Sequence, residues 1–135
     1  MKPEQTAFIL HKLKKENYSF GQSLRYVRKA QGLTIRGIAQ AVNKTATYIS
    51  DIERENNKAP ESKLMKELMD ALYMDESTAE LQNYLYDLAA RERKEVAGDI
   101  AQYIMEQEGL RAAIRLAQRQ GNDGKIWEEC IEKMR

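Results

Sequence analysis

The sequence predicts an all-α protein, with a first domain of four or five helices followed by a small helical C-terminal domain. The 135 residues include only 2 prolines and 7 glycines, which favours helix. Apolar residues recur at spacings of three and four and rarely alternate with polar ones, so helices are indicated and strands are not. A chain of this length can bury one good core or two small ones. We expect an N-terminal segment at 1–18 that can be helical, a first domain at 19–75 and a C-terminal domain at 76–135.

Capping residues divide residues 19–75 into four helices. The first three begin after residues whose hydroxyl can accept from free backbone N–H groups: Ser19, Thr34 and Thr45. Gly32 and Asn43, which tolerate left-handed dihedrals, follow the first and second helices. A fourth helix is expected from about Ser62 to Tyr73, after Pro60. Only about Asn43 and Lys44 connect the second and third helices, and so short a connection sets them at a steep angle and leaves the third protruding.

The second half shows the same periodicity. Ser77 and Glu80 are suited to a capping box ahead of a helix. Further helices are expected to stop at Gly109 and at Gly121, and a last one to follow Asp123. Their apolar stripes need a partner surface, which predicts dimerisation through residues 76–135. Folding back on the first domain and holding an effector remain alternatives.

Charge is unevenly distributed along the chain. Residues 1–60 hold 11 basic and 5 acidic side chains, a net charge of +6, whereas residues 61–135 hold 11 and 16, a net charge of −5. Lys and Arg that neutralise phosphates release condensed counterions, which favours association with a polyanion. The first half is therefore the candidate for binding nucleic acid.

Several other classes of protein are excluded. His11 is the only histidine and has no cysteine or carboxylate partners at ligand spacing, so neither a metal site nor a histidine-based catalytic centre is indicated. Glycine-rich phosphate loops are missing, and we expect no cofactor and no enzymatic activity. Cys130 is the lone cysteine and falls at helical spacing from Trp127 and Met134, as a small core residue would. No apolar run is long enough for a signal peptide or a membrane span, so a cytoplasmic protein is expected.

Residues 20–74 resemble the Cro/C1-type, or XRE-like, helix-turn-helix family of phage repressors and bacterial regulators. The matching features are Leu24 and Arg28, Gly32-Leu33-Thr34, Ile38-Ala39, Tyr48-Ile49-Ser50, Ile52-Glu53-Arg54, and Pro60 before the helix from Leu64 to Leu72. The resemblance implies a lambda-repressor-like domain of four or five helices that binds double-stranded DNA. It also implies a homodimer on a palindromic operator and a role in transcriptional repression.

The resemblance assigns roles to individual residues. Ala46, Thr47 and Asp51 match positions that face base edges, with Tyr48 and Ser50 beside them. The hydroxyl of Thr45 lies at a helix start that suits a phosphate. The DNA backbone is the expected partner of four basic residues: Arg36, Lys44, Arg54 and Lys58. Arg28 and Glu53 match a structural salt bridge between the first and third helices.

Three residues depart from the family pattern. Ile35 stands where a polar residue commonly reaches a phosphate, and Gly37 lies inside the second helix at a cost of up to about 1 kcal/mol. Glu55 replaces the usual glycine, so the turn after the third helix is expected to use Asn56 or Asn57.

The sequence thus predicts a sequence-specific transcriptional regulator, a repressor that reads its operator with the helix from Thr45 to Arg54. The alternative is a helical protein-interaction module, such as an antitoxin-type adapter, that keeps the fold without reading DNA. Asp51 and Ile35 favour this alternative. A protein antagonist, if one exists, is not identified by the sequence.

Overall fold

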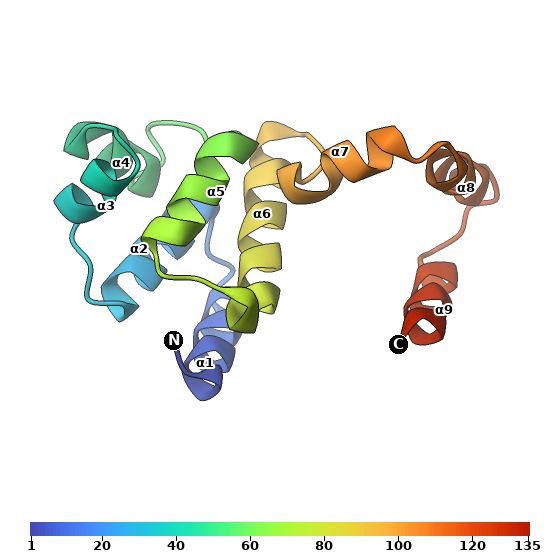
Figure 1. Cartoon of the computed structure of the whole chain (residues 1–135), viewed down its shortest axis with the longest axis horizontal. Helices are drawn as coiled ribbons and strands as arrows, with labels where there is room; N and C mark the ends of the chain where they lie inside the picture. The colour runs from blue at the N-terminus through green and yellow to red at the C-terminus, as the bar shows by residue number, and fades with distance from the viewer. The chain divides into compact units, whose positions relative to one another are not determined.

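Every regular element of the computed structural model, which describes residues 1–135, is a helix (Figure 1). The elements are α1 (Pro3–Lys15), α2 (Phe20–Ala30), α3 (Ile35–Ala41), α4 (Ala46–Glu53), α5 (Ser62–Ala71), the 3-10 helix η1 (Glu76–Thr78), α6 (Ala79–Arg93), α7 (Gly98–Glu106), α8 (Glu108–Arg119) and α9 (Lys125–Met134). The predicted all-α class is confirmed. None of these helices combines the length and the apolar character that crossing a membrane requires.

The chain divides into two compact units, which are residues 1–99 (unit 1) and residues 100–135 (unit 2). This division lies later than the predicted boundary between residues 75 and 76. The reason is α6, whose buried Leu81 and Leu85 belong to the same core as Ile9 and Leu13 of α1. An apolar stripe shows that a helix must be covered but not by which surface, so periodicity alone does not assign α6 to unit 1. The N-terminal segment, as α1, is part of unit 1 as well.

Three predicted caps are present. Ser19 forms a capping box with Gln22: its Oγ accepts from the Gln22 N–H at 3.2 Å, and the Ser19 N–H donates to Gln22 Oε1 at 3.0 Å. Thr34 and Thr45 accept from the backbone N–H three residues on, at 2.9 and 3.0 Å. Each cap satisfies a donor that the first turn of a helix leaves free. The caps therefore explain where α2, α3 and α4 begin.

The predicted box of Ser77 and Glu80 is wrong. Asp75 is the capping residue: its carboxylate accepts from the Ser77 N–H at 2.9 Å, and its own N–H donates to Thr78 Oγ1 at 3.1 Å. A carboxylate and a hydroxyl two residues apart are both good caps, so the sequence pattern does not choose between them. The choice adds the short helix η1 before α6.

Residues with a left-handed backbone conformation follow α2, α3 and α4, the three helices that carry the expected site. Gly32 has φ of 70° and Asn43 has φ of 57°, as their residue types predict. Glu55 itself adopts φ of 66°, so the expectation that Asn56 or Asn57 would make this turn is wrong. The N–H groups of both asparagines instead donate to the Asp51 carbonyl, at 2.8 and 3.2 Å. These bonds hold the chain beyond α4 against the end of the helix.

The core of unit 1 lies between α1, α6 and the four helices α2–α5. Its largest fully buried side chains include Phe20, Leu24, Ile38, Ile49, Ile52, Met65, Leu68 and Leu72. At Gly21 the backbones of α2 and α4 meet, because a Cβ added there would collide with the Ile52 carbonyl oxygen. The crossing of α2 and α4 therefore requires glycine at this position.

Unit 2 consists of most of α7 together with α8 and α9. The expected stop at Gly109 is wrong, since α7 ends at Glu106 and Gly109 lies in the first turn of α8. Gly121, with φ of 69°, follows α8 as predicted. Gly124 precedes α9 with φ of 105°, a backbone conformation that residues other than glycine rarely adopt.

Candidate nucleic-acid interface

The helix α4 is held on one side by the core and is exposed on the other. Ile49 and Ile52 are buried at 0% and 1% exposure, and they fix which face of α4 points inward. Between the caps of α3 and α4 stand only Asn43 and Lys44, and the Lys44 N–H donates to the Ala39 carbonyl at 2.9 Å. The predicted short connection is therefore present, and it joins two helices that pack on each other.

The predicted base-contacting residues lie on the outward side of α4. Ala46 and Thr47 are exposed in its first turn, and Tyr48, Ser50 and Asp51 are half-buried beside them. Small side chains at the start of the helix leave its backbone accessible. The outward side of α4 is therefore polar and accessible to solvent.

Asp51 is paired within the helix. Its Oδ1 accepts from Nη2 of Arg54 at 3.3 Å, an ion pair between residues three apart. Arg54 therefore offsets the charge of this carboxylate. Both side chains remain partly accessible, at 29% for Asp51 and 59% for Arg54.

Basic side chains lie on α3 and on the segments directly before and after α4. Lys44 lies in the turn before it, with Nζ 5.5 Å from the centre of the Tyr48 ring, a cation–π contact. Partial burial raises the pKa of the Tyr48 phenol above its ordinary value, so the ring stays neutral beneath the ammonium group. Arg36 is exposed in the first turn of α3, and Lys58 is exposed in the segment after α4.

A hollow of about 690 Å³ opens beside this turn, and it brings together Lys44, Tyr48 and Lys58. Two further basic residues that sequence reasoning missed, Lys63 of α5 and Arg93 of α6, line it as well. Lys63 follows Lys58 by five residues and could have been noted from the clustering of lysines. Arg93 lies in the acidic half, and only the packing of α6 on unit 1 places it here.

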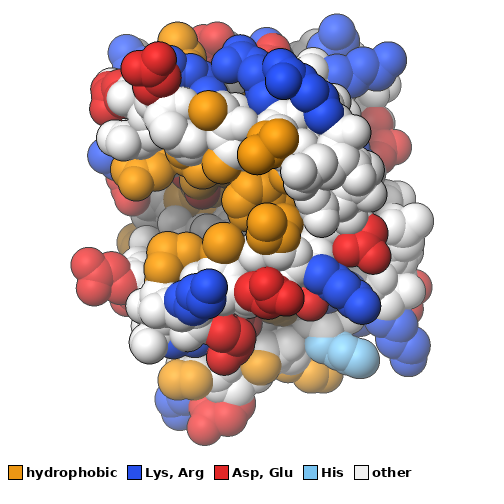
Figure 2. All heavy atoms as spheres, turned by 90° about the vertical axis from the view of Figure 1, so that its right-hand side faces the viewer, with side chains coloured by type: hydrophobic (Ala, Val, Ile, Leu, Met, Phe, Trp, Pro, Cys, Tyr) orange, Lys and Arg blue, Asp and Glu red, His pale blue; other side chains and the backbone are white.

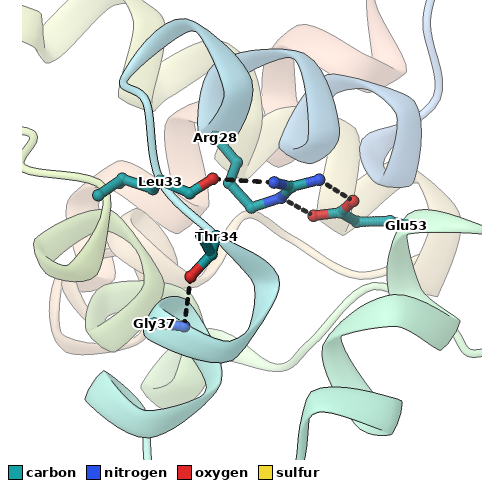
Figure 3. Close-up of polar contacts among 5 residues, drawn as sticks. All are labelled: Arg28, Leu33, Thr34, Gly37 and Glu53. Atoms are coloured by element: carbon teal, nitrogen blue, oxygen red, sulfur yellow. Dashed lines mark hydrogen bonds and ion pairs between the residues drawn. The ribbon is translucent and has the colours of Figure 1, made fainter.

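An ion pair between α2 and α4 orients the exposed helix (Figure 3). The Arg28 guanidinium donates from Nε and Nη2 to the two carboxylate oxygens of Glu53, at 2.7 and 3.0 Å. Its Nη1 donates to the Leu33 carbonyl at 2.9 Å, and both charged residues are buried. The pair that the resemblance implied is therefore formed in the bidentate geometry that arginine and carboxylates favour.

Glu92 and Arg93, two consecutive residues of α6, bind backbone groups at the start of α2 and in the segment after α4. Glu92 Oε1 accepts from the Phe20 N–H at 3.1 Å, which satisfies a free donor at the start of α2. Arg93 Nη1 donates to the Ala59 carbonyl at 3.2 Å, in the segment that follows α4. The last turn of α6 thus fixes both α2 and the loop that carries Lys58.

Comparison with known families decides what this arrangement is. Residues 24–72 match the family model described as helix-turn-helix, and the match begins inside α2 and ends just after α5. This segment is a Cro/C1-type helix-turn-helix domain. No curated protein and no solved structure matches the chain.

The helix-turn-helix domain explains the local geometry. Its two central helices are α3 and α4, its turn is Asn43 and Lys44, and α2 and α5 cover the inner side in a lambda-repressor-like fold. Domains of this family belong to DNA-binding regulators. The helices α1 and α6 lie outside the matched segment, although they share its core.

Proposed function

We propose that the protein is a sequence-specific regulator of transcription, acting as a repressor, and that α4 reads a double-stranded DNA operator. The observation that carries the proposal is the exposed face of α4, which follows Lys44 directly and has Lys58 beside the same turn, within a helix-turn-helix domain. A protruding helix in such a domain enters the major groove with its N-terminal residues against the base edges. The cytoplasm is the compartment where this protein would meet its operator.

Base contacts are assigned to the first two turns of α4. Thr47 can donate to or accept from a base, and Ala46 can contact a thymine methyl group. Ser50 and Tyr48 lie beside them and contribute to the same surface. Asp51 can accept from a cytosine amino group, and its pairing with Arg54 lowers the repulsion that a free carboxylate would meet near phosphates.

Phosphate contacts are assigned to the residues around the turn. The Thr45 oxygen already accepts from the Tyr48 N–H, so its hydroxyl proton remains free to donate to a phosphate. Lys44, Arg36 and Lys58 are exposed and can neutralise backbone charges. Arg54, on the far end of the helix, can do the same on its exposed side.

Repression would result from two copies of the protein that bind one operator together. A homodimer would place two copies of α4 in successive major grooves, about 34 Å apart, on a palindromic operator. Bound there, it would exclude polymerase or a competing regulator. A protein that binds unit 1 or unit 2 could relieve repression, and its identity is open.

A protein-interaction module is the second candidate function. Half-buried Ile35 at the start of α3, where a phosphate contact would be expected, favours it. Salt distinguishes the two candidates, because affinity that rests on phosphate contacts falls steeply with ionic strength and an apolar protein interface responds far less.

Selection of bound duplexes from a random pool tests the proposal most directly, because it yields activity and target together. With the selected operator, Thr47→Ala is expected to relax the sequence preference. Lys44→Ala is expected to weaken all duplexes alike and to lower the slope of log affinity against log salt by about 1. Lys15→Ala, at an exposed lysine of α1, is the matched control and should change neither quantity. Operator binding that survives both changes at α4 and its turn would refute the assignment of this surface.

A further inference from the structure

Positive charge gathers in the hollow beside the turn before α4, which is called the basic hollow below. Two carboxylates, those of Glu61 and Glu67, line it against four basic side chains, so the hollow keeps a net charge of +2. The basic side chains come from four parts of the chain: Lys44, Lys58, Lys63 and Arg93. All of its lining residues belong to unit 1. Gathered positive charge of this kind attracts an anion.

The exposed apolar surface of the chain is of a different kind. In Figure 2, hydrophobic side chains lie at the centre of the face shown, with acidic as well as basic side chains around them. Apolar surface with mixed charges at its rim has the composition of a protein interface, whereas a polyanion requires gathered positive charge. The basic hollow, rather than this face, is therefore suited to a further contact with DNA.

Arg93 is held in place and has donors that remain available. Its Nη1 donates to the Ala59 carbonyl at 3.2 Å, and its Nε donates to Glu95 Oε2 at 3.4 Å. Nη2 makes neither bond, so its two N–H groups can donate to an acceptor outside the chain. Ala59 is buried at 1% exposure, whereas the Arg93 side chain is 29% exposed. A fixed backbone group thus orients a guanidinium that solvent still reaches, and an oriented guanidinium is well suited to a phosphate.

The charge of Arg93 acts close to α4. Partial burial raises the pKa of the Tyr48 phenol, Glu61 raises it further, and Arg93 acts in the opposite direction, so both charged groups lie near this ring. Lys44 Nζ lies 5.5 Å from the centre of the same ring. Tyr48 therefore has near it one basic residue from the turn before α4 and one from the last turn of α6.

Lys63 reaches the basic hollow from the start of α5. It is exposed and takes part in none of the ion pairs of the chain. No side chain caps the first turn of α5, so the backbone N–H groups there lack a partner within the helix. Their partial positive charge adds to that of the Lys63 ammonium group. Two cations from helices far apart in the sequence thus face one hollow.

We propose that the basic hollow binds a phosphate group of one DNA strand, and that Arg93 and Lys63 hold it. This site rests on the proposed function, because a duplex that receives the start of α4 in its major groove brings its backbone to the adjoining turn. The contact extends beyond the helix-turn-helix domain, since Arg93 lies outside residues 24–72. DNA affinity therefore depends on α6, a helix that the family match does not include.

Affinity for the selected operator, measured across a range of salt concentrations, tests the proposal. Arg93→Gln keeps an amide that can donate to the Ala59 carbonyl but removes the charge, and Lys63→Ala removes a side chain that forms no ion pair. Each change should weaken binding about tenfold. Arg93→Gln should also lower the slope of log affinity against log salt by about 0.9, the contribution of one phosphate. Arg91→Gln, at an exposed residue of α6 outside the hollow, is the matched control and should change neither quantity.

A second measurement separates phosphate contact from positioning, because Arg93 also holds the segment that carries Lys58. Operators that carry one uncharged methylphosphonate, placed at each backbone position in turn, show which phosphates the protein contacts. Neutralising the phosphate in the hollow should weaken wild-type binding about tenfold and leave the affinity of Arg93→Gln unchanged. If Arg93 only positioned the segment, Arg93→Gln would respond to the same phosphates as the wild type.

Wild-type affinity and salt slope in both Arg93→Gln and Lys63→Ala would overturn the proposal. An Arg93→Gln protein that responds to every phosphate to which the wild type responds would overturn it too. In either case, weakening by Lys44→Ala would leave the proposed function standing. A wild-type protein that selects no duplex would instead refute the proposed function, and this site with it.

Discussion

Changing Glu53 to Gln should destabilise unit 1 far more than an ordinary surface substitution. The glutamine keeps the shape and one acceptor oxygen but removes the charge opposite the buried Arg28 guanidinium, which Glu53 now binds at 2.7 and 3.0 Å. Loss of one partner from a buried ion pair costs about 3–5 kcal/mol. The bond from Arg28 to the Leu33 carbonyl persists, so we expect the lower end, about 3 kcal/mol.

Urea denaturation followed by circular dichroism measures this change. For a unit of fewer than 100 residues the same loss should lower Tm by about 12–24 °C. Glu67→Gln, at an exposed residue of α5 that forms no ion pair, is the control and should stay within about 0.5 kcal/mol of wild type. If Glu53→Gln unfolds as the control does, the argument that this pair holds α2 to α4 is wrong.

Replacing both partners gives a second test of the same reasoning. The variant Arg28→Met with Glu53→Leu leaves no charge in the interior and should recover most of the stability, to within about 1.5 kcal/mol of wild type. The remaining deficit comes from the Leu33 carbonyl, which loses its donor. A double variant as unstable as the single one would show that packing, rather than the unpaired charge, sets the cost.

Three further outcomes are expected from local geometry. Gly21→Ala pushes a methyl group against the backbone of α4 and should cost about 1–3 kcal/mol in urea unfolding, whereas Gly109→Ala, which meets no atom within 4 Å, should be neutral or stabilising. Glu55 has φ of 66°, a left-handed conformation that strains a residue with a side chain, and Glu55→Gly removes this strain. The free energy of unfolding should rise by up to about 1 kcal/mol, and a loss of stability would contradict this account. Hydrogen bonds from the side chain and the backbone of Ser77 lower the pKa of Asp75, so its ionised form stabilises η1 above the ordinary pKa of 3.8 and that contribution is lost as pH falls through the lowered value. Ser77→Ala removes the hydroxyl bond and should therefore raise the Asp75 pKa in an NMR titration, and an unchanged pKa would show that the Ser77 hydroxyl does not bind the Asp75 carboxylate in solution.

The sequence predicted those features of the fold that depend on neighbouring residues. The caps at Ser19, Thr34 and Thr45 and the left-handed turn at Asn43 follow from side chains that satisfy nearby backbone groups. Local chemistry of this kind does not depend on the rest of the chain. The short turn before α4, and with it the exposed face of that helix, could therefore be placed from residue types alone.

Features that depend on distant contacts could not be predicted. The stripe of α6 fits any apolar surface, so its assignment to unit 1 required knowledge of the core it shares with α1. Glu55 takes a left-handed conformation that its residue type disfavours, because the bonds that end α4 impose it. Arg93 reaches the hollow beside Lys44 through tertiary packing, and no spacing along the chain indicates that approach.

The contacts made by Glu92 and Arg93 determine where the chain can be cut. A fragment of residues 24–72, although it contains every position of the family match, would lack the first turn of α2, which Glu92 binds at the Phe20 N–H, and the Arg93 donor that binds the Ala59 carbonyl. Truncation after residue 75 would also uncover Ile9 and Leu13, which are now 1% and 0% exposed. A fragment that keeps these contacts must include α1 and α6, and the compact unit that contains both is residues 1–99, twice the length of the family match.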